Sequence, residues 1–543
     1  MKHAANRVLN LLRKRFDPYT AYRRKVRKRE SPENKGGDRV LITIIGGTYN
    51  HLFEGLLTRK AALQGDEVFI LRCGGFLKYC DSVNIELSHK KLRCQVCQAQ
   101  QEDFMRAFGG TDCPYERYIL PEDQALFAEY IEEFFRHPKE RHIYRDTAID
   151  GILYTALQRH YLIAAPEVRD DAVTRGFLQT ILSTLTVMDR LCAEIKPQVV
   201  ITSHGTYSTW GSVLGYCRAK GIYVVTHGQN YNKNGIEFTY NDTCLRPHPS
   251  GEDSSWRQTP LTPEQRKVVQ RFLDERLGRV RDSDVTFDYN KDRRTSYTAQ
   301  EIREMLHIDA SKKMVGLFPN IPWDGALTGE SMVFPNFRDW LKATVDYFSN
   351  QEDAVLVIRS HPAELLRGDA AGHETTATML GEMYAALPDQ IRLLPPDHPV
   401  NSYVLGAAMD FGITYSSTVT LELIYLGKPV ILCGCPPFQG EDVAFEINSK
   451  EQYLQRIEQG MRGELQVDRE RAERLLRFVH KHFFVRTMPQ TLVQVKDTIP
   501  ERLLFKSEED LDRDAVFDEM YHCIKEQKPM NFSRFYRQDS ECS

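Results

Sequence analysis

Residues 354–362 read Ala-Val-Leu-Val-Ile-Arg-Ser-His-Pro, a continuous apolar run that ends in a polar turn. Further runs of this kind are found at residues 40–45, 67–71, 199–202, 223–226, 314–318, 391–394, 409–413 and 429–432. Short, continuously apolar runs separated by helical stretches are typical of parallel strands that are buried on both faces. A polar segment at about 249–300 divides the runs into two series. We therefore predict an α/β protein with two doubly wound domains that face one another.

The chain of 543 residues is too long for a single hydrophobic core. Its 41% hydrophobic and 27% charged residues are close to the usage of ordinary globular proteins, which argues against a disordered or collagen-like chain. No stretch approaches the ~18 apolar residues of a membrane-spanning helix, and the first residues lack the apolar run of a signal peptide. We therefore expect a cytoplasmic protein.

The pattern of runs and linkers predicts five segments. They are a basic tail and linker at 1–37, an N-terminal Rossmann-like domain at 38–300 with a helical insertion at about 98–192, a C-terminal Rossmann-like domain at 301–490, and a C-terminal helical extension at 491–543.

The basic charge of the chain is concentrated at its start. Residues 1–31 carry eleven basic and two acidic side chains, whereas the chain as a whole has a net charge of −4. One interpretation is a cationic amphipathic helix that binds an anionic membrane surface, at the inner face of the membrane; the other is a solvated, frayed terminus. Because the folded body is acidic, we do not expect a nucleic acid as a partner.

In open α/β sheets, ligands bind beyond the carboxyl ends of the strands. The residues that follow the predicted strands of the second domain are Arg359, His361, Asn320, Ser416, Ser417, Thr418 and Glu422. A Ser-Ser-Thr turn that leads into a helix offers hydroxyl and backbone N–H donors to a phosphate. His361 can donate to the same phosphate, and Glu422, one turn on, can accept from ribose hydroxyls. The alternatives are a simple helix cap at 416–418 and a loop histidine before a rigid Pro362 turn.

The first domain provides the candidates for a general base. Histidines follow three of its predicted strands, at His51, His204 and His227. An imidazole titrates near neutral pH and can take a proton from a hydroxyl group, so His51 and His227 are candidate bases. Asp150 and Asp324 are carboxylate candidates. A satisfied core histidine remains the alternative at each histidine position.

Four cysteines form a separate candidate site. Cys94 and Cys97 are separated by two residues, and Cys73 and Cys80 could complete a structural zinc site. The six-residue gap between Cys73 and Cys80 departs from the usual spacing, so reduced, buried thiols are the alternative reading. We expect no required cofactor, because the residues that follow the predicted strands can bind a phosphate without a divalent metal.

Three stretches of the second domain carry a resemblance to a known family. Arg359-Ser360-His361-Pro362, Tyr415-Ser416-Ser417-Thr418 with Glu422, and Gly427-Lys428-Pro429-Val430-Ile431 resemble the capsule polysaccharide biosynthesis family of GT-B glycosyltransferases, which includes β-Kdo transferases. Bacterial sialyltransferases have comparable HP and SS motifs. The resemblance covers about residues 305–490, and over 39–240 it is mainly architectural.

In such enzymes the HP and SS motifs hold the nucleotide of a CMP-activated sugar. The resemblance therefore implies a GT-B-like glycosyltransferase that moves a sugar from a nucleotide-sugar donor to a surface polysaccharide or lipid-linked glycan. It makes the second-domain set the donor site and the first domain the acceptor domain. No glutamate stands at the E-x7-E distance beyond Glu422, so neither retention nor inversion of the anomeric configuration is predicted.

Other functions are compatible with the same architecture. A nucleotide-sugar epimerase and a CDP-glycerol-type glycerophosphotransferase are alternative enzymes, and a catalytically silent scaffold of a polysaccharide assembly complex is the non-enzymatic alternative.

Overall fold

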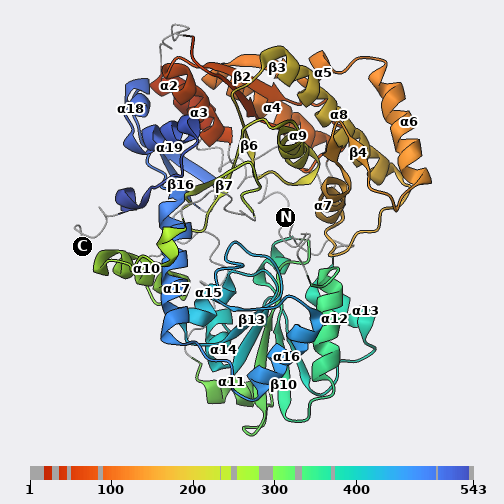
Figure 1. Cartoon of the computed structure of the whole chain (residues 1–543), viewed down its shortest axis with the longest axis vertical. Coiled ribbons are helices and arrows are strands. Elements are labelled where there is room, and N and C mark those ends of the chain that lie inside the picture. Colours follow the sequence, from red (N-terminus) through yellow and green to blue (C-terminus); the bar gives the residue numbers. More distant parts are fainter. Residues whose placement is uncertain are drawn as a thin grey trace, which may run out of the picture.

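The computed structural model describes residues 17–26, 36–45, 51–82, 90–232, 234–245, 254–280, 297–323, 333–367, 374–496 and 499–536. These residues form two α/β halves, one above the other in Figure 1, each built around its own sheet. Within the described residues, no helix combines the length and the apolar character needed to cross a bilayer.

The sheet of the first half has seven strands in the order β15-β8-β7-β6-β1-β2-β3. Five of them are parallel: β1 (Arg39–Thr43), β2 (Glu67–Arg72), β3 (Thr111–Pro114), β6 (Val199–Ser203) and β7 (Val224–Gln229). The other two strands are β8 (Ile236–Tyr240), which is antiparallel to β7, and β15 (Thr487–Met488), which is antiparallel to β8. The chain reverses direction across the sheet between β1 and β6, which is the switch point of this half.

Helices and two short strands connect the strands of the first sheet. They are α3 (His51–Leu63), α4 (Lys90–Phe108), α5 (Tyr115–Tyr118), α6 (Asp123–Arg136), β4 (Ile143–Tyr144), β5 (Thr147–Ala148), α7 (Asp150–Tyr161), α8 (Ala172–Ile195), the π-helix η2 (Tyr207–Gly211) and α9 (Ser212–Lys220). The stretch predicted as a helical insertion thus also contains the edge strand β3 and the β4–β5 hairpin.

The sheet of the second half has six parallel strands in the order β11-β10-β9-β12-β13-β14. They are β9 (Lys313–Phe318), β10 (Ala354–Arg359), β11 (Ile391–Leu394), β12 (Phe411–Thr414), β13 (Val430–Leu432) and β14 (Phe445–Glu446). All six residues of β10 are buried, as the continuous apolar run predicts. The predicted fold class, an α/β protein with two doubly wound halves, is confirmed.

The second sheet is covered by α11 (Ala299–Met305), α12 (Phe337–Phe348), α13 (Thr376–Met383), α14 (Ser402–Ala408), α15 (Val419–Tyr425) and α16 (Lys450–Met461). The side chains of Trp340 and Phe348 on α12 are fully buried in the core of this half.

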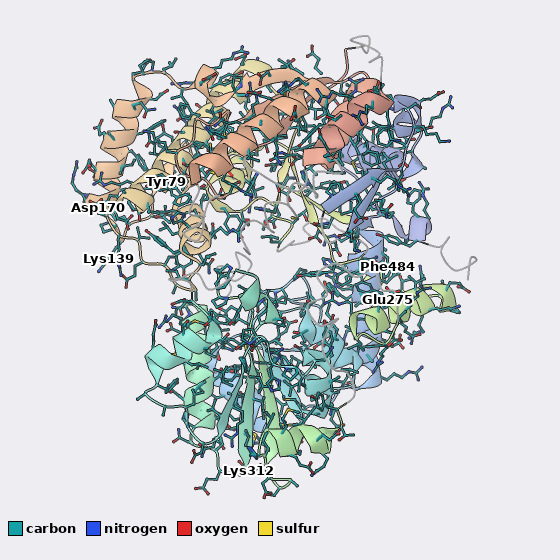
Figure 2. All side chains as sticks on the ribbon, turned by 180° about the vertical axis from the view of Figure 1, so that it is seen from behind. Tyr79, Lys139, Asp170, Glu275, Lys312 and Phe484 are labelled. Carbon is teal, nitrogen blue, oxygen red and sulfur yellow. The ribbon has the colours of Figure 1, made fainter. Side chains whose placement is uncertain are left out.

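Two helices connect the halves on one side of the molecule. α10 (Pro263–Arg276) packs against α17 (Arg469–His480), which continues as the π-helix η6 (Lys481–Val485) and leads to β15 in the first sheet. The ring of Phe272 on α10 lies 5.7 Å from that of Phe484 on η6. Figure 2 labels Glu275 and Phe484 at this junction.

The C-terminal part of the chain packs on the first half. It consists of the hairpin β16 (Val493–Lys496) and β17 (Ile499–Leu503), followed by α18 (Glu508–Asp512) and α19 (Ala515–Glu526). Lys60 on α3 forms an ion pair with Asp518 at 2.5 Å, and the hydroxyl of Tyr22 on α2 (Pro18–Lys25) donates to Glu508 at 2.8 Å. In Figure 1 the blue C-terminal helices accordingly lie beside the red N-terminal ones. The extension predicted as helical therefore also contains a β-hairpin.

Candidate functional site

A pocket of about 80 Å³ lies where β9, β10 and β12 end. His361 follows β10, and Ser417 and Thr418 follow β12, so these three residues line one pocket at the switch point of the second sheet. Tyr231 of the first half and Arg276 at the end of α10 complete its wall. Ligand pockets usually measure about 300–1,000 Å³, so this volume suits a small group such as a phosphate rather than a whole nucleotide.

The imidazole of His361 is held in one orientation by the backbone that follows it. The N–H of Ala363 donates to Nδ1 of His361 at 3.1 Å, so in the neutral ring the proton is on Nε2 and this atom is a donor. The N–H of Glu364 donates to the carbonyl oxygen of His361 at 3.0 Å. The Glu364 carboxyl accepts from the hydroxyl of Thr376 at 2.7 Å, and burial raises its pKa to about 7. The turn after β10 is therefore fixed by hydrogen bonds on both sides of Pro362.

The Ser-Ser-Thr turn divides into a structural residue and two pocket residues. Ser416 Oγ accepts from the N–H of Cys435 at 3.0 Å, and the N–H of Ser416 donates to Asn320 Oδ1 at 2.9 Å. Neither Ser416 nor Asn320 is among the residues that line the pocket, whereas Ser417 and Thr418 are. The following helix, α15, has only seven residues, so the side chains rather than a long helix dipole provide most of the polar character.

Arg359 lines the pocket, but its guanidinium is engaged elsewhere. It donates to the carbonyl oxygens of Pro395, Pro396 and His398, and thereby fixes the loop that follows β11. This arginine was predicted as a ligand-binding residue, and the structure shows it holding a neighbouring loop.

Glu422 was expected to accept from a ribose. Its side chain is 0% exposed and is not part of the pocket wall. Its carboxylate instead forms an ion pair with Arg276. Burial raises the pKa of Glu422, and the positive charge of Arg276 opposes that shift. A direct ribose contact is not available to a carboxylate in this position.

Arg276 and Tyr231 are pocket residues that the sequence did not reveal. The guanidinium of Arg276 lies 5.1 Å from the ring centre of Tyr231 and donates to Thr418 Oγ1 at 3.3 Å. Arg276 belongs to the polar segment at about 249–300, whose sequence indicates a connection between the two domains. A signal for α10 was present, because Thr262 and Gln265 form a capping box at its start.

The two histidines predicted as bases lie in the core of the first half. His227 at the end of β7 is 0% exposed, its Nε2 is 3.3 Å from Glu54 Oε1, and its ring is 5.3 Å from that of Phe53. His51, at the start of α3, is also buried. Neither is among the residues that line the pocket. Glu54, the partner of His227, was not singled out from the sequence.

Of the two carboxylate candidates, the structure describes Asp150, and this residue is not part of the pocket wall. Asp150, at the start of α7, accepts from the N–H of His142 at 2.9 Å and lies 2.8 Å from Nδ1 of the same residue. It therefore holds the segment before β4 rather than facing the pocket. Asp324 lies outside the described residues.

The four cysteines do not fit a zinc site. Among the described residues, which include all four, no group of three or more His, Cys, Asp or Glu side chains could hold a metal ion. Gln101 Nε2 donates to Cys97 Sγ at 3.5 Å, and Gln98 Nε2 donates to Cys94 Sγ at 3.3 Å. Burial raises the pKa of Cys97 to about 12, which disfavours the thiolate that zinc requires.

No protein-family model matches the chain, and no curated protein matches its sequence significantly. Several solved structures resemble it distantly. A β-Kdo 2,4-transferase, KpsC of Thermosulfurimonas dismutans, is 14% identical with a TM-score of 0.34, over 57% of this chain and 85% of that one. A UDP-GlcNAc 2-epimerase of Neisseria meningitidis is 10% identical with a TM-score of 0.24, over 81% and 98%. A glycosyltransferase of Rickettsia africae is 9% identical with a TM-score of 0.29, over 90% and 98%.

Proposed function

We propose that this protein is a glycosyltransferase that takes a sugar from a nucleotide-sugar donor and binds the departing phosphate between His361 and the Ser417–Thr418 turn. The observation that carries the proposal is that these residues, which follow two different strands, line one pocket together with Tyr231 of the other half. The HP and SS motifs at 359–362 and 415–418 are the basis for CMP as the nucleotide and a glycan as the acceptor.

In this reaction the leaving group is the part of the substrate that the enzyme must stabilise. As the bond between sugar and phosphate breaks, negative charge develops on the phosphate oxygen that leaves. Donors fixed in advance around that oxygen stabilise the transition state more than the ground state. Nε2–H of His361 and the hydroxyls of Ser417 and Thr418 are donors of this kind, and the hydrogen bond from Ala363 keeps the histidine in the donating tautomer.

The first half contains an internal example of anion binding at the equivalent turn. β6 occupies the same place in the order of the first sheet as β12 does in the second. After β6, the backbone N–H and hydroxyl groups of Ser208 and Thr209 donate four hydrogen bonds of 2.8–3.1 Å to the carboxylate of Asp81. This turn in the first half is thus closed by the protein's own anion. The turn after β12 instead borders the pocket, which supports an anionic ligand there.

The general base is not assigned by the described residues. His51 and His227 are buried, and Asp150 is engaged with His142. Asp324 stays a prediction. The acceptor would have to enter from the side of the first half, where Tyr231 reaches the pocket.

The test is a turnover assay with CMP-, UDP- and GDP-sugars, with and without glycan acceptors, on the wild type and the variants His361→Asn and Ser417→Ala. We expect acceptor-dependent release of one nucleotide, and a loss of about 100-fold in the histidine variant. Full turnover in both variants would overturn the proposed donor site.

The same assay separates the alternatives. A sugar isomer formed without acceptor would identify an epimerase, and transfer of glycerol phosphate from CDP-glycerol would identify a glycerophosphotransferase. If no nucleotide or nucleotide sugar raises the melting temperature, the proposal fails and the scaffold alternative is favoured.

A further inference from the structure

Arg276 occupies an unusual position at the junction of the two halves. It is the last residue of α10, and its side chain is only 7% exposed. Its guanidinium forms an ion pair with Glu422 of α15 and donates to Thr418 Oγ1. It also lies 5.8 Å from the ring centre of Phe272 and 5.1 Å from that of Tyr231. One side chain thus contacts the connecting helix, the first half and the phosphate-side turn of the second half.

The guanidinium has donors to spare. An arginine carries five N–H groups in a planar fork. Nε donates to Glu422 and Nη2 donates to Thr418. The remaining N–H groups have no hydrogen-bond partner among the described residues, and Arg276 borders the pocket. Planar pairs of N–H groups match two oxygens of a phosphate, and such charge-assisted bonds are stronger than neutral ones.

Glu422 explains how a cation can be kept in this place. Burial alone would lower the pKa of Arg276, but the negative charge of Glu422 raises it, so the arginine stays charged. Glu422 Oε2 is buried and has no hydrogen-bond partner among the described residues. The ion pair with Arg276 is therefore the function that the structure indicates for this carboxylate.

We propose that Arg276 binds the phosphate of the nucleotide, and that Glu422 is the positioning residue that holds the guanidinium at the pocket. This inference rests on the proposed function and replaces the ribose contact expected for Glu422 with an indirect role. Because Tyr231 of the first half stacks on the same guanidinium, the phosphate site is shared by both halves.

The test measures affinities for cytidine, CMP and CDP, and for uridine, UMP and UDP, by calorimetry. In the wild type, we expect the phosphate-bearing ligands to bind more tightly than the nucleoside. Arg276→Gln should weaken CMP or UMP binding by about 10- to 100-fold and leave the nucleoside unchanged, because the lost hydrogen bonds involve charged groups. Glu422→Gln should lower the nucleotide-to-nucleoside affinity ratio less, since the amide still accepts one hydrogen bond. General damage to the fold would lower both affinities together.

The control is Arg271→Gln, five residues earlier on α10, whose side chain is 61% exposed and pairs only with Glu275 among the described residues. It should bind all six ligands as the wild type does. If Arg276→Gln does not fold, Arg276→Lys keeps the charge and loses the planar fork, and it should still lower the ratio.

The outcomes distinguish the two proposals. If the wild type binds no nucleotide, the proposed function fails. If the wild type binds CMP or UMP and an Arg276 variant keeps the wild-type ratio of nucleotide to nucleoside affinity, the assignment of Arg276 is wrong while the proposed function stands.

Discussion

The backbone N–H of Ala363 donates to Nδ1 of His361 at 3.1 Å, so Nδ1 holds the ring in the fold, and we expect Nε2 to donate to the ligand. Asparagine and glutamine separate these two functions, because an Asn amide overlaps Nδ1 and a Gln amide overlaps Nε2. We expect His361→Asn to retain the melting temperature and lose about 100-fold in kcat/KM. His361→Gln should retain more activity and lose about 1 kcal/mol of stability. The opposite ranking in paired assays of activity and unfolding would contradict the assigned tautomer.

Ser416 and Ser417 are neighbours with different functions. Ser416 Oγ accepts from the N–H of Cys435, and Ser417 borders the pocket. Ser416→Ala should lower the free energy of unfolding by about 1 kcal/mol, because a buried N–H loses its acceptor. Ser417→Ala should raise the KM for the donor or lower kcat, and it should leave the melting temperature unchanged. Denaturant unfolding and steady-state kinetics on both variants check this, and equal effects of the two on stability would speak against the division.

A buried carboxyl beside β15 makes stability depend on pH. Burial raises the pKa of Glu237 on β8 from 4.5 to about 7. The folded chain therefore holds this proton more tightly than the unfolded chain, and the stabilisation is lost as the pH rises from about 4.5 through about 7. Glu237→Gln should stabilise the protein at pH 8, by up to about 3 kcal/mol, and much less at pH 5. Thermal unfolding at both pH values tests this, with Glu129→Gln at an exposed position of α6 as the control.

The two halves are also joined on the side away from α17. The N–H of Ala164 in the first half donates to Glu374 Oε2 at 2.6 Å, and the N–H of Glu374 donates to the carbonyl oxygen of Leu162 at 2.9 Å. Glu374→Ala should increase hydrogen exchange at 162–164 and the radius of gyration in solution scattering. Glu382 shares the partner Arg338 but is exposed, and Glu382→Ala serves as the control. Equal exchange in both variants would show that Glu374 does not hold the halves together.

We propose that the basic N-terminal segment binds an anionic membrane surface. In α2, Tyr22 is buried against the first half, whereas Arg23 and Arg24 are exposed. Deletion of residues 1–16 leaves α2 in place and removes five basic side chains. Each basic residue near an anionic surface contributes about 1 kcal/mol, so binding to phosphatidylserine vesicles should fall by well over tenfold. Sedimentation with neutral vesicles is the control, and unchanged binding to the anionic vesicles would exclude residues 1–16 as the anchor.

The fold was predictable because its strands are continuous apolar runs. The runs at 40–45 and 354–358 match β1 and β10 to within two residues. Strands without such a run were missed: β3 reads Thr-Asp-Cys-Pro at the edge of its sheet, and β14 and β15 have two residues each. Elements this short or polar depend on their neighbours, and no periodicity in the sequence marks them.

The presence of His361 and Ser417 in one pocket was predictable for a related reason. β10 and β12 both pair with β9, so the residues after them lie at the same edge of the sheet. The orientation of a side chain was not predictable in the same way. Spacing along the helix placed Glu422 one turn after the hydroxyl groups, but it could not show that the carboxylate faces α10. Arg276 is remote in sequence from every motif, so only the folded chain reveals it.

The attachment of 491–536 to the first half determines the order in which the chain can fold. As the ribosome synthesises the protein, β1 to β8 emerge first but still lack the edge strand β15 and the acidic partners of Lys60 and Arg59 on α18 and α19. The second sheet, by contrast, is complete as soon as residue 446 has emerged. The half that is made first is therefore finished last, and a fragment that stops near residue 490 would leave it with an uncovered helix α3.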